Sequence, residues 1–168
     1  MNSADQDRSD ELRMTVTRPL EGMRVVDLTD HRGDIGPWIL GELGADVIKV
    51  EPPGGCSTRG SGPIRKGDTS DLRSLHFSAY SSNKRSIVLN LEESQDQETF
   101  LKLLETADFL YESGMPSLLS DVGIDRSQIT STNNQLIHVI ITPFGADGPR
   151  ATDPHSELSI ASLGGSPN

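Results

Sequence analysis

The stretch MRVVDLTDHRGDIGPWILGELGADVIKVE, residues 23–51, decides the fold of this chain. Its first part, Met23 to Thr29, is rich in β-branched residues before it turns polar, which is typical of a strand. Its last part, Asp46 to Glu51, has the same character. Between them, Pro37 suits the first turn of a helix and Gly44 suits its end, with apolar residues at helical spacing in between. Strand, helix and strand in this order predict a βαβ unit with parallel strands.

The rest of the chain continues the alternation of strands and helices. We predict further strands at residues 85–90, 107–111 and 136–142, and helices at 75–82, from Ser94, at 116–120, at 125–133 and from about His155. The run LIHVIIT, residues 136–142, is the most apolar of the strands, so we expect a central parallel strand buried on both faces. The pattern predicts the α/β class: an open, mostly parallel sheet with helices on both faces.

Composition limits the kinds of partner. The chain has 168 residues, which fits one domain, and a formal net charge of −10. Nucleic acid is excluded as the main partner because phosphate backbones require a basic face. A small molecule with phosphate groups needs only a few local donors and stays possible.

The remaining global features indicate a cytoplasmic protein. The single cysteine, Cys56, cannot form an internal disulfide, and no apolar run has the length of a membrane span. We therefore expect no membrane partner. Residues 1–18 lack an apolar signal core and predict a disordered leader, and residues 19–168 form the folded domain. Residues 52–73 predict a long loop, which is more often functional or mobile than idle.

Ligands of open parallel sheets collect outside the carboxyl ends of the strands. Three features fall there: the turn at residues 29–37, the acid Glu51 with its Pro-Gly loop, and the turn PFGADGPR at 143–150. The first turn presents backbone amides at a helix start, where an anion is favoured. Glu51 stands roughly where dinucleotide folds carry the acid that binds a ribose. The first turn offers only Gly33 and Gly36, however, so a purely structural turn is the alternative.

Several polar residues are candidates with two interpretations each. Lys84 and Arg85 precede a predicted strand and would either hold phosphates or form a solvated turn. The four histidines show no metal-ligand spacing, so no metal site is predicted. His138 fits a structural role within its strand, whereas His155 is either a site residue or part of a helix cap. We interpret Cys56 as a loop residue rather than a nucleophile. The residues alone thus predict an α/β domain with a site for an anionic ligand.

Seven motifs taken in order are more specific than any one of them. They are PLEGMRVVDLT, GPWILGELGADVIKVEPPGG, TRGSGP, NKRSIVLNL, LLETADFLYES, PFGADGP and SELSIASLGG. In this order and spacing they resemble the N-terminal part of the class III CoA-transferase family, which includes formyl-CoA transferase, carnitine CoA-transferase and α-methylacyl-CoA racemase. The resemblance runs from about Pro19 to Asn168 and covers less than half of a full-length member.

The resemblance implies a Rossmann-like large domain that binds CoA thioesters as substrates, with no permanently bound cofactor. It also implies carboxylic acids as acceptors, and either a homodimer or the remainder of a longer chain as the protein partner. In the transferases an aspartate attacks the thioester and forms a mixed anhydride with the enzyme. That aspartate follows the position of Glu157 by some two to three dozen residues, beyond Asn168, so we expect this chain alone to be inactive.

The same resemblance implies site residues. The catalytic group comprises the backbone amides of Asp34 and Ile35, which would stabilise an oxyanion, and the acid Glu157. The positions that would contact CoA are Arg32, Gly33, Leu89, Ser113, Gly114, Asp121 and Val122. Asp121 replaces the arginine that binds a CoA phosphate in the family, and this reversal of charge predicts weaker binding. His155 and Glu157 are separated by Ser156, so they do not match the His-Asp pair of the racemases.

Two hypotheses about function stand at this point. The chain is either the N-terminal segment of a CoA-transferase or a non-catalytic, diverged domain for CoA, nucleotide or protein binding. A stand-alone dinucleotide-binding domain is disfavoured because the third glycine of its fingerprint is absent.

Overall fold

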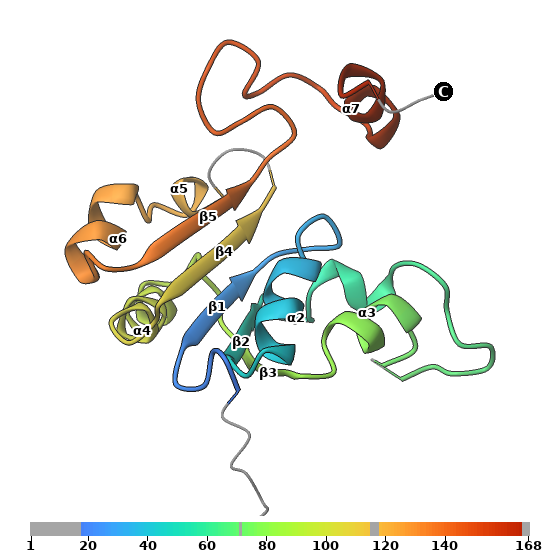
Figure 1. The fold of residues 1–168 in the computed structure, drawn as a ribbon, viewed down its shortest axis with the longest axis horizontal. Helices are drawn as coiled ribbons and strands as arrows, with labels where there is room; N and C mark the ends of the chain where they lie inside the picture. The colour runs from blue at the N-terminus through green and yellow to red at the C-terminus, as the bar shows by residue number, and fades with distance from the viewer. Residues whose placement is uncertain (1–17, 71, 115–117, 166–168) are drawn as a thin grey trace, which may run out of the picture.

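The βαβ unit predicted from residues 23–51 is present in the computed structural model, which describes residues 18–70, 72–114 and 118–165. The predicted leader, apart from Arg18, and the first two residues of the helix predicted at 116–120 lie outside the described residues. Five parallel strands form one sheet in the order β3-β2-β1-β4-β5 (Figure 1). They are β1 (Arg24–Leu28), β2 (Asp46–Glu51), β3 (Lys84–Val88), β4 (Phe109–Ser113) and β5 (Ile137–Ile141).

Helices cover both faces of this sheet, which confirms the predicted class. They are α2 (Ile35–Glu42), the 3-10 helix η1 (Ser57–Gly60), α3 (Leu75–Tyr80), α4 (Ser94–Leu104), α5 (Leu118–Asp121), α6 (Arg126–Thr132) and α7 (Glu157–Leu163). Helix α2 lies on one face, over β1 and β2, and α4, α5 and α6 lie on the other (Figure 1). Helix α7 stands apart from the sheet at the end of a long connection.

The alternation of side chains along β1 explains why there are two cores. Val25 and Val26 are both fully buried, but they point to opposite faces of the strand. Val26 belongs to the larger core under α4 to α6, with Val50, Leu89, Phe100, Leu104, Ala107, Leu110, Leu119, Ile124 and Ile129. Val25 belongs to the smaller core under α2, with Ala45 and Val47. Each fully buried aliphatic or aromatic side chain contributes roughly 1.5–3 kcal/mol of burial free energy.

Helix α2 begins at Ile35, so Pro37 lies within the first turn as predicted, where no N–H is needed. The helix ends at Glu42, and Gly44 follows with a φ of 108°. A side chain at Gly44 would also lie 2.3 Å from Cβ of Arg18. Gly44 therefore ends the helix for the reason predicted: the backbone enters a region that favours glycine.

Strand β4 begins two residues later than predicted. Ala107 N–H still donates to Leu104 O, 3.2 Å away, so the end of α4 uses the residue that was expected to open the strand. Asp108 then exchanges hydrogen bonds with Arg24 at the start of β1. This register brings Glu112 and Ser113 into the strand, where successive side chains turn to opposite faces.

The prediction that residues 136–142 form a central strand is wrong. Strand β5 is the edge of the sheet, and Ile137 is 53% exposed. One face of β5 packs toward α5 and α6, whereas no described helix lies over the other face (Figure 1). The continuous hydrophobicity of this run therefore marks an apolar face that no described helix covers, and not a central position.

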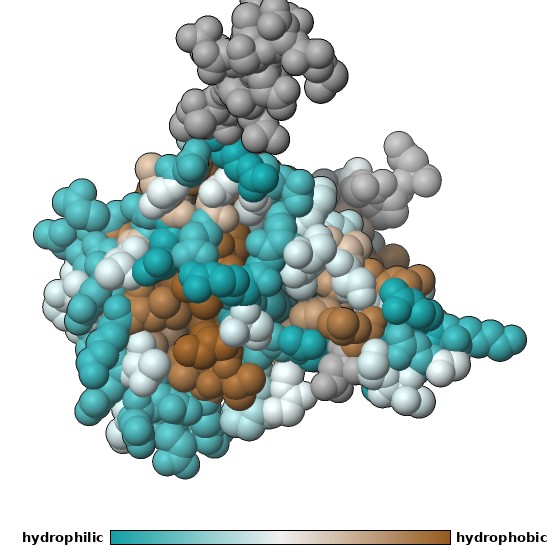
Figure 2. Space-filling view, turned by 90° about the horizontal axis from the view of Figure 1, so that it is seen from below, coloured by the Kyte–Doolittle hydropathy of each residue, from teal (hydrophilic) through white to brown (hydrophobic). Residues whose placement is uncertain are grey.

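A second apolar stripe remains on α2. Ile35, Ile39 and Leu43 are spaced by four residues and are 53%, 45% and 40% exposed. The space-filling view shows that hydrophobic side chains also reach the surface on the side seen from below (Figure 2). Within the described part of the chain, no helix has both the length and the apolar character needed to span a membrane.

Candidate functional site

A cavity of about 570 Å³ opens where the sheet changes winding direction, between the carboxyl ends of β1 and β4. Open α/β sheets bind their ligands at this topological switch point. Its wall includes the predicted residues Arg32, Leu89, Ser113, Gly114, Asp121 and Val122. We call this cavity the switch-point groove. Residues that are far apart in the sequence thus meet in one place.

Gly33 does not line the groove and has a different reason to be glycine. A Cβ atom there would lie 2.8 Å from the Cδ1 atom of Ile141 and 2.8 Å from the Cγ2 atom of Thr29. Real Cβ atoms do not approach other carbon atoms that closely, so a side chain would force the turn away from β5. Gly33 therefore allows the turn after β1 to pack tightly against the sheet.

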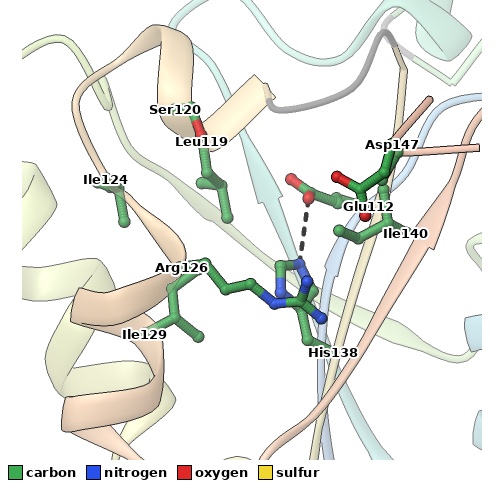
Figure 3. Close-up of a pocket in the computed structure, with 10 residues that line it drawn as sticks. Glu112, Leu119, Ser120, Ile124, Arg126, Ile129, His138, Ile140 and Asp147 are labelled. Carbon is green, nitrogen blue, oxygen red and sulfur yellow. Dashed lines mark hydrogen bonds and ion pairs between the residues drawn. The ribbon is translucent and has the colours of Figure 1, made fainter. Parts of the chain in front are cut away.

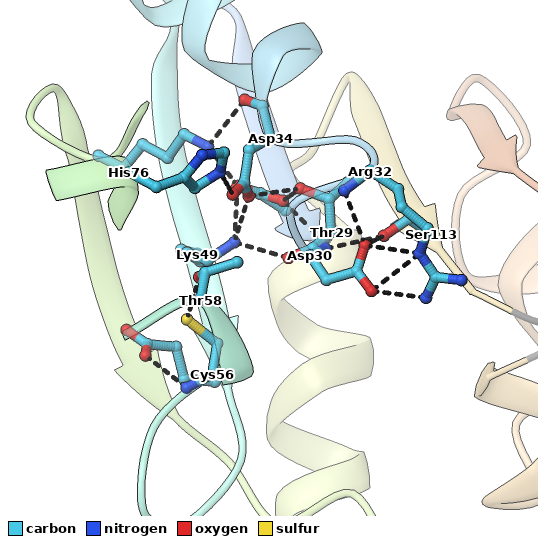
Figure 4. A network of polar contacts seen from close by, with 12 residues as sticks. Thr29, Asp30, Arg32, Asp34, Lys49, Cys56, Thr58, His76 and Ser113 are labelled. Atoms are coloured by element: carbon cyan, nitrogen blue, oxygen red, sulfur yellow. Dashed lines mark hydrogen bonds and ion pairs between the residues drawn. The ribbon is translucent and has the colours of Figure 1, made fainter. Parts of the chain in front are cut away.

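The turn after β1 is tied to β4 through Asp30. Its N–H donates to Ser113 Oγ at 2.7 Å, and Ser113 Oγ donates to Asp30 Oδ1 at 2.8 Å. Arg32 donates to both carboxylate oxygens of Asp30 from its guanidinium, and also from its backbone N–H (Figure 4). Burial alone would raise the pKa of Asp30, but the hydrogen bonds from Arg32 and Ser113 outweigh it and hold the pKa well below its usual range. Arg32 therefore enters the groove with its charge already neutralised.

The two predicted oxyanion donors differ in the structure. The N–H of Asp34 donates to Asp30 O at 3.0 Å, so the turn itself uses it. The N–H of Ile35 opens α2, and within the described ranges it has no acceptor. Of these two backbone N–H groups, the one of Ile35 is thus available to a ligand at this helix start.

Buried charges lie directly beneath this turn (Figure 4). Lys49 Nζ lies 3.4 Å from Asp27 Oδ2 and 3.2 Å from Asp34 Oδ1. Lys84 Nζ lies 2.8 Å from Asp27 Oδ2, and His76 Nε2 lies 3.2 Å from Asp34 Oδ2. Except for His76, these side chains are at most 1% exposed. We call these five residues the turn-anchoring network.

Charge pairing explains why the network tolerates burial. Desolvation alone would lower the pKa of Lys49, but the carboxylates of Asp27 and Asp34 outweigh it and raise the pKa. Removing one member would leave an uncompensated buried charge. Both interpretations of Lys84 from the sequence are therefore wrong: its side chain neither faces a ligand nor lies in solvent. Arg85 instead pairs with Asp46, from its Nε at 2.8 Å.

Glu51, the acid at the end of β2, has an internal role. Its carboxylate accepts from Arg59 Nε at 2.6 Å, from Arg59 Nη2 at 2.7 Å, from the backbone N–H of Cys56 at 2.9 Å and from Ser86 Oγ. Burial would raise its pKa, but these donors outweigh burial and lower the pKa to about 2. Glu51 fastens the Pro-Gly loop to the sheet, and both its oxygens are occupied. It borders the groove, but it does not serve as a free acid for a ribose.

Cys56 lines the groove as a half-buried loop residue. Its Sγ lies 3.0 Å from Thr58 Oγ1. Burial raises the pKa of the thiol, which lowers the fraction of reactive thiolate. This agrees with the interpretation of Cys56 as a loop residue rather than a nucleophile.

Two groove carboxylates differ from Asp30 and Glu51. Glu92, after β3, and Asp121, at the end of α5, both line the groove. Within the described residues, neither carboxylate has a hydrogen-bond or ion-pair partner. Sequence reasoning missed Glu92, although its position just beyond a strand end was the signal that could have identified it.

Glu157 lies outside the groove but next to its turn. Its side chain is 90% exposed, and Oε1 lies 3.8 Å from His31 Nε2. The start of α7 is therefore beside the turn after β1, although α7 makes no part of the groove wall. His155 packs its ring edge-on against Phe144, with 6.5 Å between the ring centroids.

A smaller cavity of about 270 Å³ lies behind α5, between β4, β5 and α6 (Figure 3). Glu112 Oε1 and His138 Nε2 meet there at 3.1 Å. Glu112 Oε2 and His138 Nδ1 are buried without a partner among the described residues. The pair agrees with a structural role for His138, and Glu112 was missed because β4 was predicted to end before it.

Comparison with known proteins gives matches over most of the chain. The profile of CoA-transferase family III matches residues 20–168. The chain is 37% identical to the succinyl-CoA:(R)-benzylsuccinate CoA-transferase subunit BbsE of Thauera aromatica, over 84% of this chain and 35% of that protein. It is 38% identical to the acetyl-CoA:oxalate CoA-transferase of Acetobacter aceti, over 88% of this chain and 37% of that protein.

The fold also matches a solved structure. The crystal structure of Rv3272 from Mycobacterium tuberculosis is 31% identical and superposes with a TM-score of 0.74, over 89% of this chain and 41% of that one. The chain thus spans only a little more than a third of the length of these relatives.

Proposed function

Because this chain belongs to CoA-transferase family III, we propose that it binds the CoA part of a thioester in the switch-point groove. We further propose that it is the N-terminal segment of an enzyme that moves CoA between a thioester and a carboxylic acid. The observation that carries the proposal is the groove itself, which lies at the switch point and is lined by six of the positions that the family resemblance singled out. Its volume of about 570 Å³ falls within the range of small-molecule sites.

In the proposed reaction, Ile35 N–H stabilises the oxyanion that forms on the thioester carbonyl. The support is its position at the start of the eight-residue helix α2, where the helix dipole favours negative charge. Asp34 acts indirectly in this proposal, because its buried side chain holds the turn through Lys49 and His76. Glu157, the first residue of α7, contributes its carboxyl group, which lies near His31.

The nucleophile in this proposal is an aspartate in the C-terminal direction from Glu157, as the family resemblance implies. Its carboxylate oxygen attacks the thioester carbonyl carbon, the C–S bond breaks, and CoA leaves as the thiolate. The thiolate then attacks the aspartyl carbonyl of the mixed anhydride, which releases the donor carboxylate and leaves an aspartyl-CoA thioester. The acceptor carboxylate attacks that thioester and expels the CoA thiolate. The thiolate finally attacks the acceptor's carbonyl carbon, so the acceptor leaves as its CoA thioester and the aspartate is regenerated. CoA is a substrate in this scheme and not a resident cofactor.

A diverged, non-catalytic CoA-binding or interaction domain is the second candidate. The observation that favours it is the pair of unpaired groove carboxylates, Glu92 and Asp121, which oppose an anionic ligand.

In either case we propose a cytoplasmic protein that forms a homodimer or joins the remainder of a longer chain. The uncovered apolar stripe of α2 and the open face of β5 support such a partner.

Calorimetric titration with CoA tests the groove. Val122 lines it, so Val122→Trp is expected to fill the space and raise the Kd for CoA at least tenfold. Val88→Trp is the matched control, because Val88 is 58% exposed and lies outside the groove. Equal affinity of both variants, or no CoA binding by the unaltered chain at millimolar concentration, contradicts the proposal.

A further inference from the structure

Charges in the switch-point groove are unevenly neutralised. Asp30 is paired with Arg32, and Glu51 is paired with Arg59. Among the described residues these two pairs leave Glu92 and Asp121 as carboxylates without a partner. They come from different walls, the segment after β3 and helix α5. A ligand in the groove therefore meets net negative charge.

The described cations near the groove have internal roles. Both carboxylate oxygens of Asp30 accept hydrogen bonds from Arg32. Turning Arg32 toward a phosphate would leave the Asp30 carboxylate without this partner, although burial already disfavours its charged form. Lys49 and Lys84 are at most 1% exposed in the turn-anchoring network. These described groups therefore offer no ready counter-charge for a dianionic phosphate.

The acidic residue at the position that usually binds a ribose already has hydrogen-bond partners within the chain. In dinucleotide sites an acidic residue beyond the first βαβ unit accepts hydrogen bonds from ribose hydroxyls, and an arginine accommodates a ribose phosphate. Here Glu51 stands at the end of β2 with both oxygens engaged by Arg59, Ser86 and Cys56. Glu92 and Asp121 are the groove carboxylates that remain able to accept hydrogen bonds from hydroxyl groups.

We propose that the groove selects a CoA-type nucleotide whose ribose hydroxyls are free, so that it binds 3′-dephospho-CoA more tightly than CoA, with Glu92 and Asp121 as the specificity-determining residues. The inference rests on the proposed function, because it assumes that the groove takes the nucleotide end of a CoA-type thioester. The physical reason is that a carboxylate only accepts hydrogen bonds. It pairs with a hydroxyl, and it repels a phosphate that also only accepts.

The expected preference follows from Coulomb's law. A phosphate of charge −2 at about 10 Å from one carboxylate, across a water-like dielectric, loses about fourfold in affinity. Two such carboxylates make the expected ratio of the two Kd values roughly tenfold at low ionic strength. Added salt should reduce the ratio, because both carboxylates are open to solvent.

Isothermal titration of the 168-residue chain with CoA and with 3′-dephospho-CoA tests the inference. The unaltered chain should bind 3′-dephospho-CoA about tenfold more tightly. Asp121→Asn and Glu92→Gln should each reduce that ratio about two- to fourfold, and Asp121→Arg should abolish it, because the new positive charge offsets the remaining repulsion from Glu92. Glu98→Gln is the matched control: Glu98 is exposed on α4 outside the groove, so the same loss of charge should leave the ratio unchanged.

Each other outcome has a definite meaning. Equal or tighter binding of CoA by the unaltered chain overturns the inference but leaves the proposed function standing. An equal effect of Glu98→Gln and Asp121→Asn also overturns it, because net charge alone would explain the ratio. Binding of neither nucleotide overturns the proposed function together with the inference.

Discussion

Lys84 Nζ lies 2.8 Å from Asp27 Oδ2, and both side chains are at most 1% exposed. The pair joins β3, at one edge of the sheet, to the end of β1, where the functional turn begins. Lys84 also donates to the backbone oxygen of Asp34 at 3.2 Å, so one ammonium group holds both ends of the turn. The position of the Ile35 amide therefore depends on a residue about fifty positions further along the chain.

Replacing Lys84 by methionine should destabilise the fold by about 3–5 kcal/mol, because Asp27 would keep its charge with one partner fewer. Urea unfolding followed by circular dichroism measures the change, and a chain that no longer folds also meets the expectation. Arg85→Met is the control: Arg85 is 64% exposed and pairs with Asp46 at the surface, so its loss should cost at most about 1 kcal/mol. Similar values for the two variants would contradict the anchoring role of Lys84.

Glu51 should make stability depend on pH in the acid range. Its pKa is about 2 in the folded chain against an ordinary value of 4.5, so the folded state binds fewer protons than the unfolded state between these values. The stabilisation is therefore fully present above about pH 5 and is lost as the pH falls toward 2, with a total of about 3 kcal/mol. Glu51→Gln should lose less stability than the unaltered chain over this range. Parallel stability curves for the two proteins would refute the assignment.

Gly33→Ala should destabilise the chain by about 1–3 kcal/mol, because the new Cβ would lie 2.8 Å from side-chain carbons of Ile141 and Thr29. Thermal unfolding provides the measurement. Gly60→Ala is the control, since the atom nearest to a Cβ at Gly60 is a guanidinium nitrogen of Arg73 at 3.8 Å. If both alanine variants melt at the same temperature, the turn does not pack as described.

The uncovered apolar surface should make the isolated chain self-associate. Ile39 on α2 and Ile137 on β5 are 45% and 53% exposed. Sedimentation velocity should show larger species as the concentration rises, and Ile39→Glu or Ile137→Lys should shift them toward monomer. Ile64→Lys serves as the control, because Ile64 is 44% exposed in the loop before α3. A monomer at every concentration would argue against a protein partner on this surface.

Local patterns predicted most of the elements because their causes are local. The βαβ unit follows from β-branched runs around Pro37 and Gly44, and β2 has the predicted bounds, Asp46–Glu51. The N-terminal caps of α6 and α7, at Asp125 and Ser156, are also formed by neighbouring residues. The position of β5 failed because hydrophobicity reports whether a face is apolar, and not whether anything covers it.

The sequence likewise predicted some features of the candidate site and not others. That ligands collect beyond the strand ends follows from the parallel topology, and the positions around Arg32, Ser113 and Asp121 do line one groove. The sequence could not show which charged side chains in the groove lack a partner. Arg32 and Lys84 look like phosphate ligands in sequence, and only their distances to Asp30 and Asp27 identify them as internal partners.

The amino-acid sequence by itself determined the α/β class, the order of strands and helices along the chain, and the family, because periodicity, turn residues and ordered motifs are carried by neighbouring positions. Only the tertiary structure decided the edge position of β5, the burial of Lys84 and the internal role of Glu51. The physical reason is that burial and charge pairing are set by residues brought together across the sheet, and electrostatic free energy depends on distance in space and not on separation along the chain.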